Sequence, residues 1–196
     1  DVTLFKYIPV GAGLGGGSSD AGAILRAYAL GHPEVVSLAL KLGADVPFFL
    51  APRVSYRAGV GEIDAGSVRL PKLWALLLFP RAPLLTAQVF RAFAGPLTPG
   101  FAVANPPQVF KTLNELKPWL KNDLEETACR LSRESQQARS LLTAVGAKAV
   151  VMSGSGPTMV GLFEGRAEGR RAVRLLGEQK TKYWIRLLWV LQNEDG

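Results

Sequence analysis

Apolar and polar residues recur along the chain with two periods, and each period predicts one kind of element. Asp1 to Tyr7 alternates loosely and predicts a strand, and the unbroken apolar run Leu73 to Phe79 predicts a buried strand. Further strands are expected at 47–50, 54–57, 149–152 and 158–163, and a strand or an amphipathic closing segment at 183–191. Helical spacing predicts helices at 21–30, 35–42, 86–93, 108–116, 124–129, 133–144 and 166–177.

The order of these elements bears on the fold class. Strands and helices follow one another without the regular rhythm of a doubly wound sheet, which favours an α+β fold with sheets covered on one face. Residues 95–107 are rich in proline and glycine and are the best candidate for a surface connection between two lobes. We therefore expect an N-terminal lobe at 1–94 and a C-terminal lobe at 108–196.

Composition narrows the chemistry. The 196 residues are 48% hydrophobic and 20% charged, as expected of a compact globular protein. A single cysteine, Cys129, and a single histidine, His32, exclude an internal disulfide, a Cys/His metal cage and Ser-His-Asp catalysis. This cysteine usage predicts a reducing compartment, the cytoplasm.

Charge and hydropathy address the possible partners. The net charge is +7, and much of the excess is spread at helical spacing over the last third of the chain, which favours a solvated face over a nucleic-acid patch. The longest apolar run, Leu73 to Phe79, is far short of the roughly 20 residues of a membrane-spanning helix. We expect neither a nucleic-acid nor a membrane partner.

The most informative stretch is residues 9–20, where five glycines lead into a predicted helix start. Without Cβ atoms, such a loop can bring successive backbone N–H groups against an anion, and the helix behind it adds the positive end of its dipole. Ser18 and Ser19 can add hydroxyl contacts to phosphate or to a phosphate-bound Mg²⁺. The stretch predicts a phosphate site.

Other interpretations of this loop remain. A Walker A motif is excluded because no Gly-Lys-Ser/Thr ending is present. The dinucleotide pattern Gly11-x-Gly13-x-x-Gly16 is present, but it requires an acid about 20 residues on, at the end of a parallel strand. Glu34 is near that distance, although it follows Pro33 in a predicted loop. A flexible turn is the last alternative, and five glycines would sacrifice much chain entropy for it.

Here the sequence resembles the GHMP kinases, which phosphorylate small alcohols with ATP. Their signature Pro-x-x-x-Gly-Leu-Gly-x-x-Ser-Ser is matched by Pro9, Gly13, Leu14, Gly15, Ser18 and Ser19. The extra glycines, together with segments 42–50 and 152–158, are similar to one branch, the 4-diphosphocytidyl-2-C-methyl-D-erythritol kinases of the non-mevalonate isoprenoid pathway. Weaker similarity lies at 59–62, 86–90 and 122–125.

The resemblance implies a fold and a set of roles. The fold is a two-lobed α+β GHMP kinase, with an N-terminal lobe like domain 2 of ribosomal protein S5 and a ferredoxin-like C-terminal lobe. Asp45 would be the catalytic acid that accepts or orients the proton of the substrate hydroxyl. Thr86 and Phe90 would contact the substrate, with Phe90 stacking on cytosine, and Ser19 is a candidate Mg²⁺ ligand. The ATP phosphates would be bound by Pro9, Val10, Gly11, Ala12, Gly13, Leu14, Gly15, Gly16, Gly17, Ser18, Ser19, Gly154, Ser155 and Gly156.

Several of these residues also have plain structural interpretations. Asp45 could cap a helix or close a turn, Phe90 could belong to the core, and 154–156 could be an ordinary turn between strands. These alternatives stay open on the sequence alone.

The chain also departs from the family pattern. The family's first motif, which carries a lysine near the transferred phosphate, has no counterpart, and the chain opens without Met on a strand-like segment. We therefore expect an N-terminally truncated kinase, with exposed sheet edges that favour aggregation or a homodimer. A non-catalytic nucleotide-binding remnant is the main alternative, and a dinucleotide-dependent oxidoreductase is the third.

Overall fold

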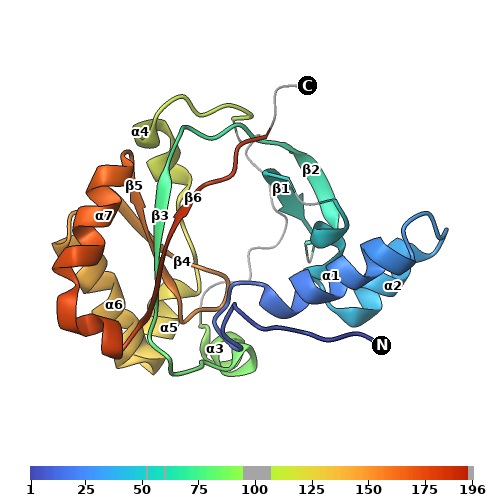
Figure 1. The fold of residues 1–196 in the computed structure, drawn as a ribbon, viewed down its shortest axis with the longest axis horizontal. Helices are drawn as coiled ribbons and strands as arrows, with labels where there is room; N and C mark the ends of the chain where they lie inside the picture. Colours follow the sequence, from blue (N-terminus) through green and yellow to red (C-terminus); the bar gives the residue numbers. More distant parts are fainter. Residues whose placement is uncertain (52, 60, 95–106, 194–196) are drawn as a thin grey trace. The chain divides into compact units, whose positions relative to one another are not determined.

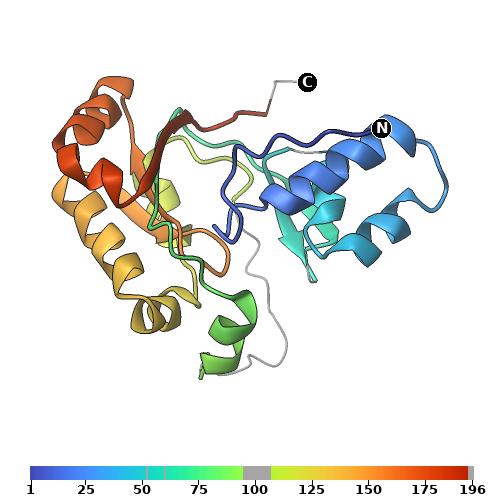
Figure 2. The same ribbon diagram turned by 60° about the horizontal axis from the view of Figure 1, so that its bottom comes forward.

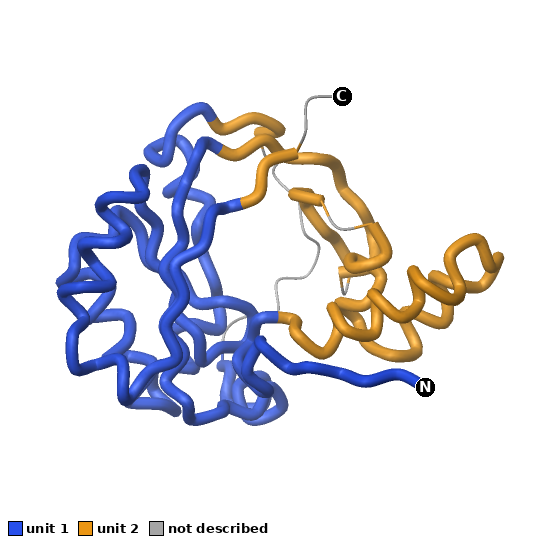
Figure 3. The backbone as a smooth tube through the Cα atoms, in the orientation of Figure 1, with its two compact units in different colours: residues 1–14, 71–106, 111–190 blue, residues 15–70, 107–110, 191–196 orange. Residues whose placement is uncertain are grey.

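The computed structural model describes residues 1–51, 53–59, 61–94 and 107–193, and within these ranges the chain forms two compact units (Figure 3). Unit 1 comprises residues 1–14, 71–106 and 111–190, and unit 2 comprises 15–70, 107–110 and 191–196. Each unit is therefore assembled from separate stretches of sequence. The predicted connection at 95–107 lies outside the described residues except for its last position, and the predicted lobe boundaries stay a prediction.

Unit 1 is built on a four-stranded antiparallel sheet with strand order β4-β5-β3-β6 (Figure 1). Its strands are β3 (Trp74–Phe79), β4 (Ala149–Met152), β5 (Met159–Phe163) and β6 (Trp184–Trp189). Leu76 on the central strand pairs with Gly161 on one side and Leu187 on the other. With helices after the first and third strands, this order is the β-α-β-β-α-β ferredoxin-like arrangement.

Helices cover one face of this sheet, as the sequence predicted. Helices α6 (Arg133–Ala144) and α7 (Arg166–Leu175) contact the strands and lie side by side on the same face (Figures 1 and 2). The core between them is fully buried and includes Leu76, Leu78 and Leu142. The remaining helices of unit 1 are α3 (Thr86–Ala92), α4 (Leu113–Leu116), α5 (Glu125–Leu131) and the 3₁₀-helices η2 (Lys117–Trp119) and η3 (Gly177–Thr181).

Unit 2 combines two helices with a hairpin. Its elements are α1 (Gly16–Tyr28), α2 (Val35–Leu42), the 3₁₀-helix η1 (Val46–Leu50), and the antiparallel strands β1 (Ser55–Ala58) and β2 (Ile63–Ser67). Gly22 of α1 lies directly against Phe49 of η1, where a Cβ atom would overlap that residue. Asn193 joins the two ends of the hairpin, because its Nδ2 donates to the carbonyls of Val54 at 2.7 Å and Val68 at 2.9 Å.

The α+β class is confirmed, and most predicted elements form close to their expected bounds. No helix in the described ranges is both long enough and apolar enough to cross a membrane. Three predicted elements are wrong or only partly formed, and one strand was not predicted.

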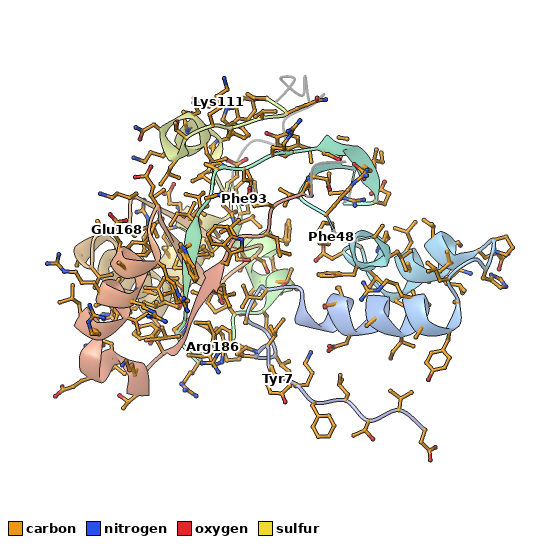
Figure 4. The ribbon with its side chains drawn as sticks, turned by 45° about the horizontal axis from the view of Figure 1, so that its top comes forward. Tyr7, Phe48, Phe93, Lys111, Glu168 and Arg186 are labelled. Carbon is orange, nitrogen blue, oxygen red and sulfur yellow. The ribbon has the colours of Figure 1, made fainter. Side chains whose placement is uncertain are left out.

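The strand predicted at 1–7 does not form. Neither sheet of the described residues pairs with this segment, and Phe5 and Tyr7 are 74% and 83% exposed (Figure 4). Alternation shows only that a segment could form a strand, since a strand also needs a neighbour for its backbone hydrogen bonds.

The strand predicted at 47–50 is instead the 3₁₀-helix η1, with Pro47 in its first turn. A four-residue apolar run has too few positions to distinguish the two periods, and proline favours a helix start. The predicted helix 108–116 is limited to α4, because the Arg69 amide donates to Gln108 at 2.7 Å and the Phe110 amide to Arg69 at 2.9 Å, which keeps 108–110 extended. Strand β2 was not predicted because its sequence, Ile-Asp-Ala-Gly-Ser, has little apolar alternation.

Candidate active site

The first part of the glycine loop, residues 9–14, belongs to unit 1, and its backbone is tightly enclosed there. Gly11 and Gly13 have φ of 71° and 70°, values that favour glycine, and Ala12 between them is 2% exposed. A Cβ on Gly13 would overlap the carbonyl oxygen of Gly156 and would lie 2.7 Å from that of Ser153. Glycine is therefore required at position 13 both by conformation and by space.

Two hydroxyl groups fix the carbonyl side of the loop. Ser153 Oγ donates to the Gly13 carbonyl at 2.7 Å, and the fully buried Thr158 Oγ1 donates to the Ala12 carbonyl at 2.6 Å. Because side-chain hydroxyls donate to these two carbonyls, the loop needs no backbone amide of its own to satisfy them. Ser153 and Thr158 were not among the predicted site residues. Their signal was in the sequence: two hydroxyl residues bracket the glycines of segment 152–158.

The segment that holds the loop is the turn between β4 and β5. The Gly156 amide donates to the Ser153 carbonyl at 2.9 Å, and the Ser153 amide donates to Thr158 at 3.0 Å. Gly154 has φ of 55° and Ser155 does not take a positive φ, which is the type II′ pattern. The stretch 154–156 is thus a turn, as one alternative held, and it also contacts the glycine loop.

One of the two residues predicted to contact the substrate lies against this turn. Thr86 Oγ1 and Ser155 Oγ lie 2.7 Å apart, so the start of α3 meets the tip of the turn. Phe90, one turn further along α3, is 60% exposed. Phe90 is therefore not a core residue, and its ring is accessible to a ligand.

The loop continues by a peptide bond into unit 2, where Gly15 begins α1 with φ of 65° and no side-chain cap. Helix α1 starts at Gly16, earlier than predicted, so Ser18 and Ser19 lie in its first turns. Among the described residues, no backbone acceptor faces the amides of Gly16, Gly17 and Ser18, and no acidic residue lies in the first turn. An uncapped helix start of this kind is suited to bind an anion through its dipole and its free amides.

Asp45 also belongs to unit 2, at the start of η1. Asp45 lies in the turn that the Val46 amide closes on the Gly43 carbonyl at 3.1 Å, as the turn alternative held, whereas its exposed side chain makes no capping hydrogen bond. The buried residues Val46 and Pro47 anchor the segment behind it. Gly61 lies close by, since a Cβ there would be 3.8 Å from Asp45 Oδ1. The backbone of Asp45 is thus held in place, and its carboxylate makes no capping hydrogen bond to the described residues.

Two other ionisable groups are engaged or shifted by their surroundings. The Gly66 amide and the Arg53 guanidinium lower the pKa of Asp64, which is engaged in the hairpin by a 2.5 Å ion pair with Arg53. Burial, and then Glu125, raise the pKa of the Cys129 thiol, which makes it a poor nucleophile. In the described ranges, no group of three His, Cys, Asp or Glu residues could hold a metal ion.

Comparison with known proteins agrees with this geometry. Residues 1–52 match the GHMP kinases N-terminal domain, and residues 107–180 match the GHMP kinases C-terminal domain. The chain is 35% identical to the 4-diphosphocytidyl-2-C-methyl-D-erythritol kinase of Geobacter sp. (strain M21), over 94% of this chain and 67% of the relative. It is 38% identical to the enzyme of that name from Rhodospirillum rubrum, over 93% of this chain and 62% of the relative. The chain thus spans about two thirds of the length of these relatives.

Two solved structures share the fold. A crystal structure of 4-(cytidine 5′-diphospho)-2C-methyl-D-erythritol kinase aligns with a TM-score of 0.70 at 35% identity, covering 96% of this chain and 69% of that one. Homoserine kinase from Cytophaga hutchinsonii aligns with a TM-score of 0.62 at 16% identity, covering 97% of this chain and 69% of that one, and supports the fold alone. Fold, family domains and sequence relatives agree: the chain belongs to the GHMP kinase family of small-molecule kinases.

Proposed function

We propose that this kinase transfers the γ-phosphoryl group of ATP to the 2-hydroxyl of 4-diphosphocytidyl-2-C-methyl-D-erythritol, a step of the non-mevalonate route to isoprenoid precursors. The choice of substrate rests on the relatives of that name at 35–38% identity and on the aligned crystal structure. The single cysteine supports the cytoplasm as the site of the reaction.

One observation supports the donor site above all others. The carbonyls of Ala12 and Gly13 are satisfied by Thr158 and Ser153, while the amides at the start of α1 have no backbone acceptor in the described part of the chain. Because the carbonyls of the loop are occupied and its amides are open, the segment is suited to bind an anion with several oxygens, such as a triphosphate.

The residues present fit MgATP as the bound form of the donor. Bound MgATP supplies the γ-phosphoryl group, and the cation offsets charge on its oxygens. Residues 9–19 would bind the phosphates, and Gly154, Ser155 and Gly156 would shape the same site. Ser19 is the candidate hydroxyl ligand of Mg²⁺, which accepts a few protein ligands and retains phosphate and water for the rest.

The alcohol is assigned to other residues. Asp45 would accept or orient the proton of the substrate hydroxyl. Its exposed carboxylate is suited to this role because it is not engaged in capping η1. Thr86 and Phe90 would contact the substrate, because the exposed Phe90 ring can stack on cytosine.

The test combines nucleotide binding with turnover. Calorimetry would measure MgATP binding to this chain and to Asp45→Asn, an isosteric change that removes the carboxylate charge but leaves the loop intact. Phosphoryl transfer to 4-diphosphocytidyl-2-C-methyl-D-erythritol would then be measured for both proteins. We expect equal nucleotide affinity and transfer that is at least about 100-fold slower in Asp45→Asn.

The outcomes separate the alternatives. Binding by both proteins without transfer by either would favour a nucleotide-binding remnant that does not turn over. Equal transfer by both would remove Asp45 from the mechanism. Absence of binding would refute the phosphate loop itself.

A further inference from the structure

Two side chains ahead of and within α5 hold the end of strand β4 through both the carbonyl and the amide of its last residue. Asn122 Nδ2 donates to the Met152 carbonyl at 2.9 Å, and the Met152 amide donates to Glu125 Oε2 at 2.8 Å. Met152 is the last residue of β4 and immediately precedes the turn that contacts the glycine loop. Its backbone is thus fixed by residues outside the sheet.

Asn122 reaches further into the turn. Its Nδ2 also donates to the Gly154 carbonyl at 2.7 Å, and its Oδ1 accepts from the Leu124 amide at 3.0 Å. Both amide hydrogens and the amide oxygen are therefore in use, which fixes the orientation of the side chain. An asparagine with all its groups engaged specifies the position of the atoms it contacts.

Glu125 contributes a charge with little exposure to water. Its side chain is 16% exposed, and its second oxygen, Oε1, lies 2.9 Å from Nε of Arg139 on α6. A carboxylate bound to both a guanidinium and a backbone amide makes stronger hydrogen bonds than a neutral group would. Arg139 thereby anchors the carboxylate that holds the Met152 amide.

The position of the turn determines the position of the loop, because hydrogen bonds join the two. Ser153, between the two residues that Asn122 contacts, donates to Gly13, and Thr158 on the returning side donates to Ala12. No space separates Gly13 from the turn, since a Cβ there would overlap the Gly156 carbonyl. A displacement of residues 152–154 would therefore displace the carbonyls of 12 and 13.

We propose that Asn122 and Glu125 are positioning residues for the triphosphate loop. In this proposal they act through the backbone of the turn and not by binding the nucleotide. They set the 152–154 backbone, which sets the loop through Ser153 and Thr158. The inference rests on the proposed function for the identity of the loop's ligand, whereas the link from α5 to the loop rests on hydrogen bonds within unit 1.

The sharpest variant is Asn122→Asp, which keeps the shape and replaces two hydrogen-bond donors by an acceptor. The carbonyls of Met152 and Gly154 would then face a carboxylate oxygen. Asn114→Asp is the matched control, because Asn114 is exposed on α4 and only accepts a 3.0 Å hydrogen bond from Lys117, which aspartate can also accept. Asn122 and Glu125 line an open cavity of about 460 Å³, so changes there leave no sealed void.

A second pair of variants tests Glu125. Glu125→Ala removes the acceptor of the Met152 amide, and Glu125→Gln retains an acceptor but loses the charge that pairs with Arg139. If the acceptor oxygen of residue 125 positions the turn, Glu125→Gln recovers most of what Glu125→Ala loses. A requirement for the charge alone would leave Glu125→Gln as impaired as Glu125→Ala.

Hydrogen exchange of the 196-residue chain, followed by calorimetry with MgATP, distinguishes the possible results. We expect Asn122→Asp to increase exchange locally at residues 11–18 and to weaken MgATP binding about tenfold, as loss of one or two hydrogen bonds would. In turnover assays, we expect KM for ATP to rise by a similar factor while kcat and KM for the alcohol change less than about threefold.

Other results would overturn one claim or the other. Unchanged exchange in the loop, or exchange raised throughout unit 1, would refute the positioning role. A locally loosened loop in a chain whose unsubstituted form does not bind MgATP would support the link from α5 and refute the proposed function instead.

Discussion

Unit 1 and unit 2 are stabilised by different means. The core of unit 1 is one continuous cluster that includes Leu76, Leu78 and Phe163, each at most 1% exposed. In unit 2, the described buried apolar residues are few and scattered, and both helices carry exposed ones, such as Tyr28 at 78% and Leu42 at 62%. Packing maintains unit 1, whereas close glycine contacts, the Asn193 hydrogen bonds and the hairpin ion pair maintain unit 2.

The largest expected effect is in the core of unit 1. Leu78→Ala should reduce the free energy of unfolding of this unit by about 2–5 kcal/mol, because it removes a fully buried side chain from the central strand. Tryptophan fluorescence during urea unfolding measures this unit, since Trp74, Trp119, Trp184 and Trp189 all belong to it. Leu42→Ala, on the exposed side of α2, is the control and should change stability by less than about 0.5 kcal/mol. Equal effects of the two variants would contradict the claim that core packing stabilises unit 1 more than unit 2.

In unit 2, the sensitive position is a glycine. Gly22→Ala should destabilise this unit by about 1–3 kcal/mol, because the added Cβ would overlap Phe49 and displace η1. Gly17→Ala on the same helix has no atom within 4 Å of its Cβ and should raise stability by up to about 1 kcal/mol. Far-UV circular dichroism during thermal unfolding would measure both. A Gly22→Ala protein as stable as Gly17→Ala would show that α1 and η1 are not closely packed in solution.

Alkaline pH should affect unit 1. Burial, followed by Glu134, raises the pKa of Tyr183 above 10.0, so the folded state favours the neutral phenol. The resulting contribution to stability is complete below the pKa of the unfolded chain and is lost as pH rises through the higher folded value. Urea unfolding followed by fluorescence between about pH 8 and pH 11 should show this decline. Tyr183→Phe should remove the dependence, and an unchanged slope in that variant would contradict the assignment.

Acidic pH should affect unit 2, by a smaller amount because the pair is at the surface. The Gly66 amide, then Arg53, lower the pKa of Asp64 below 3.8, so its contribution to stability is complete above the unfolded value and is lost as pH falls through the folded value. Circular dichroism from about pH 5 to pH 2 would detect the loss. Asp64→Asn should be less stable near neutral pH and less sensitive to acid; an identical acid transition in both proteins would exclude this pair.

Elements of both units differ in how well the sequence predicted them. Strand β3 and helices α6 and α7 were predictable because the apolar residues they bury form an unbroken run in β3 and recur at helical spacing in α6 and α7. Strand β2 was not, since its pairing with β1 rather than its composition makes it a strand. The same limit applied to residues 1–7, where alternation without a partner gave no strand.

The candidate site divides in a similar way. The glycine loop and Asp45 stood out because they belong to motifs with a known chemistry, and their roles remain proposals. Segments 122–125 and 152–158 stood out as well, but not which of their residues support the loop: Ser153, Thr158, Asn122 and Glu125 act through hydrogen bonds to residues distant in sequence. Only the folded structure brings these pairs together.

The pairing of the central strand has a consequence for the order of events during synthesis. Strand β3 lies between β5 and β6, whose residues leave the ribosome about 80 and 110 positions later. Asn193, which ties the ends of the β1–β2 hairpin, emerges later still. Neither unit can be completed before these residues have been synthesised, so the apolar β3 must wait for its neighbours. Contacts so distant in sequence slow folding and lengthen the exposure of β3 to aggregation, and the nascent chain therefore needs protection most between the synthesis of β3 and that of β6.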